Sequence, residues 1–237
     1  MKLSIVAAAT ASLSALTLAS PAPKSQPSAA MNTFNISAKS GTDAWRKPPS
    51  TNDFNAPTFV PAGVKSTGPL AKFKSVSVSF SFTPKVLYDQ AGVILAMRPA
   101  GSGSAKDSAP PKWVKSGVEL FNGTPCMGTV ATDNWSDWSL APVPDEAIFL
   151  PEGAPGSKQG FTRVSVEKGG DDAKAPTLWV YLVTDEGVKK PLREITWVFD
   201  PAIGDWEVDV AAYVARPQPA PDALAVSFKD FDAQWSE

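Results

Sequence analysis

Hydrophobic and polar residues alternate most clearly between Phe73 and Phe82. The apolar positions are Val76, Val78, Phe80 and Phe82, and the serines between them are Ser75, Ser77, Ser79 and Ser81. Side chains in a strand point to opposite faces with a period of two, so this pattern predicts a half-buried antiparallel strand. The serines would form its outer face.

A second alternating run covers residues 113–121 and carries charged side chains on one of its faces. Lys115 and Glu119 fall on the face opposite Val114 and Val118. Because they are four residues apart, we expect both to point the same way, with roughly 13 Å between their backbone positions. Asn122-Gly123 follows and predicts a tight hairpin, so residues 127–132 should pair back antiparallel.

The rest of the chain shows more short strands and no sustained helical period. Further strands are predicted at residues 91–97, 161–167, 178–184, 195–199, 207–214 and 224–228. Turns rich in Gly, Pro and Asp separate them at the spacing typical of sandwiches. We therefore predict an all-β sandwich, with a long loop at residues 101–111.

The first residues predict export. Lys2 gives a basic start, an uncharged apolar run follows, and Thr17 and Ala19 are placed as small residues before a cleavage site at Ser20. We predict a signal peptide at 1–19, a flexible leader at 20–30, a sandwich domain at 31–237 and a secreted protein. The alternative is translation from Met31, which would make the protein cytosolic.

Composition excludes several kinds of chemistry. The chain has no histidine and one cysteine, Cys126, so Ser-His-Asp catalysis, His-based zinc sites and intrachain disulfides are excluded. The net charge is −2, with no basic stripe for nucleic acid and no polybasic membrane anchor. We predict no cofactor, no metal site, no nucleic-acid partner and no membrane partner. The sequence leaves the oligomeric state open.

Four stretches carry a family resemblance: GTDAWRK at 41–47, LYDQAGV at 87–93, WVKSGVE at 113–119 and WSDWS at 135–139. In this order and spacing they resemble the regulation-of-enolase-protein family, over residues 32–234. The resemblance implies a concanavalin A-like jelly-roll of two antiparallel sheets in the lectin/glucanase superfamily. That superfamily includes lectins, glycosidases and structural domains, so fold alone does not give function.

We predict a ligand site on one sheet face. Its candidate residues are Trp45, Arg46, Asp89, Gln90, Trp113, Lys115, Glu119, Asp137 and Trp138. Aromatic rings against sugar CH faces, with polar groups for the hydroxyls, make a shallow carbohydrate site. The alternative is an ion-pair network that fixes strand register, with the Trp residues packing.

Non-catalytic carbohydrate binding is the predicted function. A second hypothesis is a glycosidase that uses two of Asp89, Glu119 and Asp137. Glu207-Val208-Asp209 resembles the start of the superfamily's catalytic motif, but Ala211 and Ala212 occupy the positions of its acid/base. A third hypothesis is a cytosolic regulator of a metabolic enzyme, as the family's name suggests. Asn35, Asn122 and Asn134 lie in glycosylation sequons.

Overall fold

The structure is a computed structural model that describes residues 32–102, 109–143, 160–170 and 175–237. The predicted signal peptide and leader lie outside the described residues, as does the middle of the predicted 101–111 loop. Within the described part of the chain, no helix has the length and hydrophobicity needed to cross a membrane.

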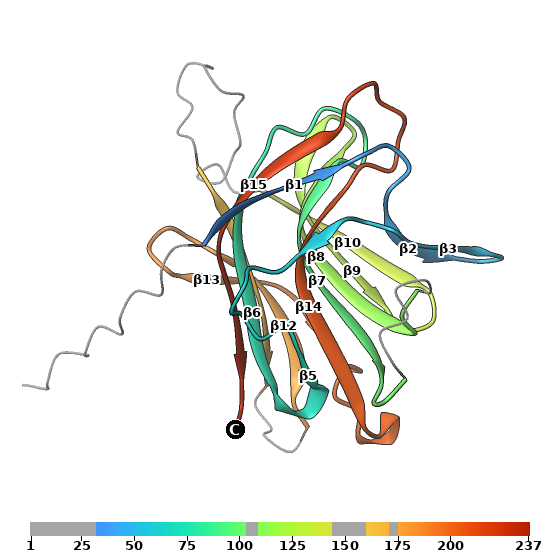
Figure 1. Ribbon diagram of the computed structural model, residues 1–237, viewed down its shortest axis with the longest axis vertical. Helices are drawn as coiled ribbons and strands as arrows, with labels where there is room; N and C mark the ends of the chain where they lie inside the picture. The colour runs from blue at the N-terminus through green and yellow to red at the C-terminus, as the bar shows by residue number, and fades with distance from the viewer. Residues whose placement is uncertain (1–31, 103–108, 144–159, 171–174) are drawn as a thin grey trace, which may run out of the picture. The chain divides into compact units, whose positions relative to one another are not determined.

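The described residues form a six-stranded and a seven-stranded sheet that pack against each other (Figure 1). In spatial order, the six-stranded sheet contains β1 (Thr33–Ala38), β15 (Leu224–Trp235), β6 (Phe73–Ser81), β11 (Thr162–Gly169), β12 (Thr177–Val183) and β13 (Lys189–Ile195). The seven-stranded sheet contains β10 (Ser136–Pro142), β9 (Thr124–Thr132), β8 (Lys112–Phe121), β7 (Gln90–Pro99), β14 (Trp206–Ala215) and β4 (Thr58–Phe59), with β5 (Thr67–Pro69) also paired to β14. The predicted all-β sandwich of two antiparallel sheets is confirmed.

The core lies between the two sheets, and the alternation along each strand decides which side chains enter it. Val76, Val78 and Phe80 of β6 are fully buried in one cluster with Val93 and Leu95 of β7. Burying apolar surface stabilises a fold by roughly 25 cal/mol per Å². Strands that alternate in this way can therefore bury one face and leave the other for polar side chains.

The hairpin between β8 and β9 forms where the sequence predicts it. Asn122 and Gly123 both have positive φ, 48° and 78°, as a tight turn of the primed type requires. The turn sets the register that pairs Lys115 with Val130 and Glu119 with Cys126. The positions of both charged side chains on the sheet therefore follow from this turn.

The prediction of a strand at residues 195–199 is wrong. The strand in this region is β13, which ends at Ile195, and the amide of Asp200 bonds the carbonyl of Trp197 in the turn that follows. Trp197 and Phe199 pack against the core from that turn. These two residues are hydrophobic because they pack in the core. The edge strand β13 was not predicted because its charged side chains break the alternation typical of a strand.

A two-stranded ribbon covers part of the outer face of the seven-stranded sheet, and the sequence did not predict it. It pairs β2 (Ala44–Lys47) with β3 (Thr51–Phe54). In Figure 1 the ribbon, in blue, lies on the side of this sheet that faces away from the other one. Ala44 packs with Ile94 and Tyr213 in a small second cluster. The ribbon therefore turns an open sheet face into one wall of a pocket.

Candidate functional site

A pocket of about 350 Å³ lies between the ribbon and the outer face of the seven-stranded sheet. It is lined by Asp43, Trp45, Lys47, Thr51, Tyr88, Gln90, Lys115, Glu119, Val130, Trp138, Pro217 and Gln218. The volume falls in the range of small-molecule sites in proteins. The lining mixes aromatic rings with buried polar groups.

Lys115 is held in the pocket by an ion pair from the ribbon. Its Nζ lies 2.8 Å from Oδ1 of Asp43, and the residue is only 3% exposed. The same carboxylate oxygen accepts the amide hydrogen of Ala44 at 2.7 Å. Because Asp43 immediately precedes β2, this pair fastens the start of the ribbon to β8. An ammonium has three donors, so Lys115 keeps hydrogen-bonding capacity beyond Asp43.

Glu119 is the buried carboxyl group of the pocket. It is 8% exposed, and its Oε2 accepts the indole N–H of Trp138 at 3.1 Å. Burial raises the pKa of Glu119 to about 7, the Asp43 carboxylate adds to the rise, and Lys115 and the Trp138 hydrogen bond oppose it. Glu119 is therefore protonated in a large share of molecules near neutral pH.

Gly128 makes room for the Glu119 side chain. A Cβ built on Gly128 would lie 2.9 Å from Oε2 of Glu119 and 3.4 Å from its Cβ. The carboxyl group therefore lies across the backbone of β9, in space that any other residue type would fill. This contact and the Trp138 indole together fix the orientation of the group.

Gln90 and Tyr213 continue the polar floor toward β14. The Tyr213 hydroxyl donates to Oε1 of Gln90 at 3.3 Å, and Nε2 of Gln90 donates to the carbonyl of Tyr88 at 3.2 Å. Burial, with smaller effects of Glu119 and Asp43, raises the pKa of Tyr213 well above its usual value. Tyr213 is therefore a neutral hydroxyl, and it is joined through the Gln90 amide to the Tyr88 carbonyl by two hydrogen bonds.

Aromatic rings form the remaining walls. The Trp45 and Trp138 rings meet edge to face, with 6.2 Å between centroids and an interplanar angle of 84°. Tyr88 approaches Trp138 at 6.2 Å and 74°, and Phe121 packs on Trp138 at 5.2 Å. Tyr88 has a φ of 67°, a left-handed conformation that costs energy for a bulky residue. Such conformations cluster at ligand sites.

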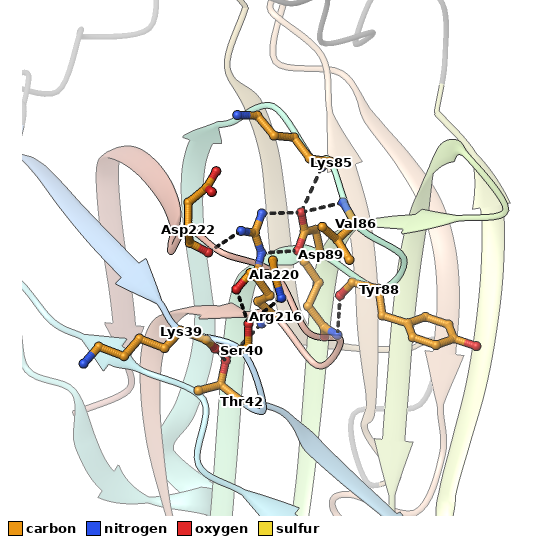
Figure 2. A network of polar contacts seen from close by, with 11 residues as sticks. Lys39, Ser40, Thr42, Lys85, Val86, Tyr88, Asp89, Arg216, Ala220 and Asp222 are labelled. Carbon is orange, nitrogen blue, oxygen red and sulfur yellow. Dashed lines mark hydrogen bonds and ion pairs between the residues drawn. The ribbon is translucent and has the colours of Figure 1, made fainter.

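A buried ion pair behind the pocket fixes the loops that carry its rim (Figure 2). Nε and Nη2 of Arg216 donate to the two carboxylate oxygens of Asp89, both at 2.7 Å. Asp89 is fully buried, and its Oδ2 also accepts the amide hydrogens of Lys85 and Val86. The hydrogen bonds that Arg216 donates to Asp89 raise the pKa of Arg216. A bidentate, fully satisfied pair of this kind specifies one geometry.

The Asp89–Arg216 pair joins three segments whose neighbouring residues line the pocket. Tyr88 and Gln90 flank Asp89, and Pro217 follows Arg216. The amide of Arg216 donates to the hydroxyl of Thr42 at 3.0 Å, one residue before Asp43. Asp89 was predicted as a ligand-binding residue, but the structure places it behind the pocket, in a supporting role.

Five of the nine predicted site residues line the pocket: Trp45, Gln90, Lys115, Glu119 and Trp138. The structure places the other four elsewhere: Arg46, Asp89, Trp113 and Asp137. The five share one sheet face and the ribbon beside it. Strand alternation is the signal that identified Lys115 and Glu119, while Trp45, Gln90 and Trp138 lie in the stretches that carry the family resemblance.

Arg46 of the ribbon packs over the ring of Trp113 on β8. The Arg46 guanidinium lies 4.3 Å from the ring centroid of Trp113 and donates to the carbonyls of Pro110 and Pro111. Trp113 is fully buried, so a ligand has no access to its ring. Asp137 is exposed and forms an ion pair with Arg193.

The sequence did not identify seven pocket residues: Asp43, Lys47, Thr51, Tyr88, Val130, Pro217 and Gln218. Asp43, Lys47 and Tyr88 each lie one or two residues from a predicted member, inside the stretches that carry the family resemblance. The others depend on how the ribbon folds over the sheet and on the loop after β14. No local pattern reports those long-range contacts.

No group of three or more potential metal ligands occurs among the described residues. The Glu207-Val208-Asp209 stretch lies on β14, where Asp209 pairs with Arg98 at 2.6 Å and accepts the Thr67 hydroxyl at 2.7 Å. Neither acidic residue lines the pocket. The stretch is therefore part of the strand framework.

Comparison with known proteins places the chain in a family. Residues 21–152 match the model of the family described as "Protein of unknown function (DUF1349)". An uncharacterized protein of Emericella nidulans is 39% identical over 198 residues, which cover 82% of each chain. These two matches are independent of the fold.

A solved structure from yeast shares the fold. A functionally unknown protein from Saccharomyces cerevisiae is 18% identical, with a TM-score of 0.56, over 86% of this chain and 89% of that one. A Bauhinia forficata lectin in complex with GalNAc is 10% identical with a TM-score of 0.40, a likeness too low to bear on function. From the sequence matches, the chain belongs to the DUF1349 family.

Proposed function

We propose that this protein binds carbohydrate in the pocket between the ribbon and the seven-stranded sheet, without covalent chemistry. The observation that carries the proposal is the combination of Trp45, Trp138 and Tyr88 rings with the buried polar groups of Lys115 and Glu119. Sugars present apolar CH faces and a rim of hydroxyls, so they need both kinds of contact at once.

The hydrogen-bonding capacity of the pocket suits hydroxyl groups, which donate and accept. Lys115 supplies donors beyond the one that bonds Asp43. Oε1 of Glu119 accepts no hydrogen bond from the described residues, and Glu119 lines the pocket. Thr51 and Gln218 at the pocket edge can do either. A polyol would satisfy these groups better than an apolar ligand.

Isothermal titration of the full-length protein with monosaccharides and cell-wall polysaccharides tests the proposal. Trp45→Ala should weaken binding by about fivefold or more, since stacking on an aromatic ring is worth about 1 kcal/mol. Trp179→Ala is the matched control, because that ring stacks on Tyr181 in the six-stranded sheet, outside the pocket. Absence of binding to every saccharide at millimolar concentration would overturn the proposal.

A glycosidase is the second candidate, now with a different pair of carboxyl groups. Asp89 and Asp137 are ion-paired outside the pocket, so the predicted trio is not brought together. Asp43 and Glu119 do share the pocket. Asp43 is ion-paired with Lys115, while Glu119 has a pKa of about 7, and such contrasting environments suit a base and an acid.

Hydrolysis of a panel of chromogenic glycosides separates this candidate from simple binding. Turnover by the wild-type protein that is lost in Glu119→Gln would establish catalysis. Binding without turnover across the panel would exclude it for those substrates.

Secretion and regulation of a metabolic enzyme remain proposals that depend on the N-terminal residues. Secretion agrees with an extracellular saccharide ligand. A cytosolic regulator of a metabolic enzyme, as the name of the regulation-of-enolase family suggests, requires translation from Met31 or a leader that is not removed. N-terminal sequencing of protein from the culture medium decides between them. A mature terminus near Ser20 supports secretion, and absence from the medium supports the cytosolic protein.

A further inference from the structure

Glu119 is a buried carboxyl group without a cationic partner among the described residues. Lys115 lies on the same face of β8, but its Nζ is bonded to Asp43 at 2.8 Å. Trp138 Nε1 is the one donor to Glu119 in the described structure, and it is neutral. A buried carboxylate that lacks a cation pays an uncompensated desolvation cost. A cation arriving in the pocket would relieve that cost.

The other charged and titratable groups around Glu119 leave the buried part of the pocket acidic. Asp43 and Lys115 offset each other, and Tyr213 and Cys126, whose pKa values are both raised by burial and then by Glu119, are neutral. Lys47 lines the outer edge, where it is exposed and screened by water. Ionised Glu119 therefore leaves one uncompensated negative charge in the buried part.

The aromatic walls favour the same kind of ligand. Trp45 and Tyr88 both meet Trp138 nearly edge to face, so rings of different orientation surround one space. The face of an aromatic ring carries negative electrostatic potential and attracts a cation within about 6 Å. Rings of this kind together with a carboxylate are a favourable environment for an ammonium group.

We propose that the saccharide bound in this pocket is an amino sugar, whose protonated amine pairs with Glu119 between the rings of Trp138 and Tyr88. This inference rests on the proposed function and names its ligand class. The hydroxyls of the sugar use Lys115 and the pocket edge, while its ammonium uses the vacant Oε1 of Glu119. Binding would also convert Glu119, whose pKa is about 7, to the ionised form.

Titration calorimetry with glucosamine, N-acetylglucosamine and glucose tests the inference, because the three share one ring and differ at one substituent. Glucosamine should bind at least about tenfold more tightly than the two neutral sugars. At pH 6, where free Glu119 is mostly protonated, its binding should release protons, seen as a heat that depends on the buffer. Neutral sugars should release none.

Glu119→Gln should reduce glucosamine affinity to that of glucose and abolish the proton release. Glu194→Gln is the matched control, because Glu194 bonds Thr177 on the six-stranded sheet and is not among the pocket residues. Equal or tighter binding of the neutral sugars would overturn the amino-sugar inference and leave the proposed function standing. Failure of all three sugars to bind would also overturn the amino-sugar inference, whereas the proposed function falls only if every saccharide of the wider titration fails to bind.

Discussion

Replacing Glu119 with glutamine should stabilise the fold at pH 8 and leave it nearly unchanged at pH 5. The carboxyl group is buried and its pKa rises from 4.5 to about 7 on folding, mainly because burial disfavours the charged form. A raised carboxyl pKa means that the folded state binds a proton more tightly than the unfolded state. Protonation of Glu119 therefore stabilises the folded state fully below pH 4.5, and this stabilisation is lost as pH rises through 7.

The magnitude follows from the two pKa values. Above pH 7 the Glu119 carboxyl group is ionised in both the folded and the unfolded state. Relative to acid pH, this group has then lowered the free energy of unfolding of the wild-type protein by about 3 kcal/mol. Glutamine is neutral throughout and keeps a carbonyl oxygen for the Trp138 indole. Asp43 still pairs with Lys115, so no buried cation is left alone. For a domain of about 200 residues, the gain at pH 8 corresponds to about 6–12 °C in Tm.

Thermal unfolding of wild type and Glu119→Gln at pH 5 and pH 8, followed by circular dichroism, measures the effect. Glu194→Gln, on the other sheet, should show no such difference between the two pH values. A Glu119→Gln variant that is less stable than wild type at pH 8 would refute the reasoning. That result would mean that Glu119 acts as a stabilising ion-pair partner in the folded state.

Three further perturbations test the frame around the pocket. Asp89→Asn should cost about 3–5 kcal/mol in urea unfolding, since it leaves Arg216 buried without its counter-charge; a loss below about 1 kcal/mol would contradict the supporting role. Gly128→Ala should displace the Glu119 carboxyl group, shift the Trp138 indole N–H resonance and weaken ligand binding; an unchanged resonance would show that the contact is unimportant. Cys126 should be alkylated more slowly in folded than in unfolded protein at pH 8, because burial and then Glu119 raise its thiol pKa; equal rates would contradict this.

The sandwich could be predicted because several of its central strands carry a local signal. The alternation in β6 and β8 reports which face enters the apolar core between the sheets, and Asn122-Gly123 sets the hairpin between β8 and β9. Those two facts were enough to place Lys115 and Glu119 on one outer face. The prediction failed for residues 195–199, where hydrophobic side chains enter the core from a turn.

The partners of the site residues could not be predicted from local pattern. Lys115 pairs with Asp43, which is 72 residues away, and Asp89 pairs with Arg216, which is 127 residues away. The first pair depends on the ribbon and the second on the loop after β14. Neither segment has a periodic pattern of hydrophobic residues. The sequence analysis therefore predicted Asp89 and Glu119 as members of one ligand-binding patch. In the structure Glu119 lines the pocket, whereas Asp89 lies behind it in the ion pair with Arg216.

The central claim is that a saccharide occupies the pocket beside Trp45 and Trp138. The most direct measurement is a saccharide titration followed through the indole N–H resonances of the eight tryptophans in ¹⁵N-labelled protein. The account predicts that the resonances of Trp45 and Trp138 move with a common dissociation constant, while that of Trp179 stays in place. Movement of Trp179 without the pocket pair, or no movement of any indole at millimolar saccharide, would contradict it.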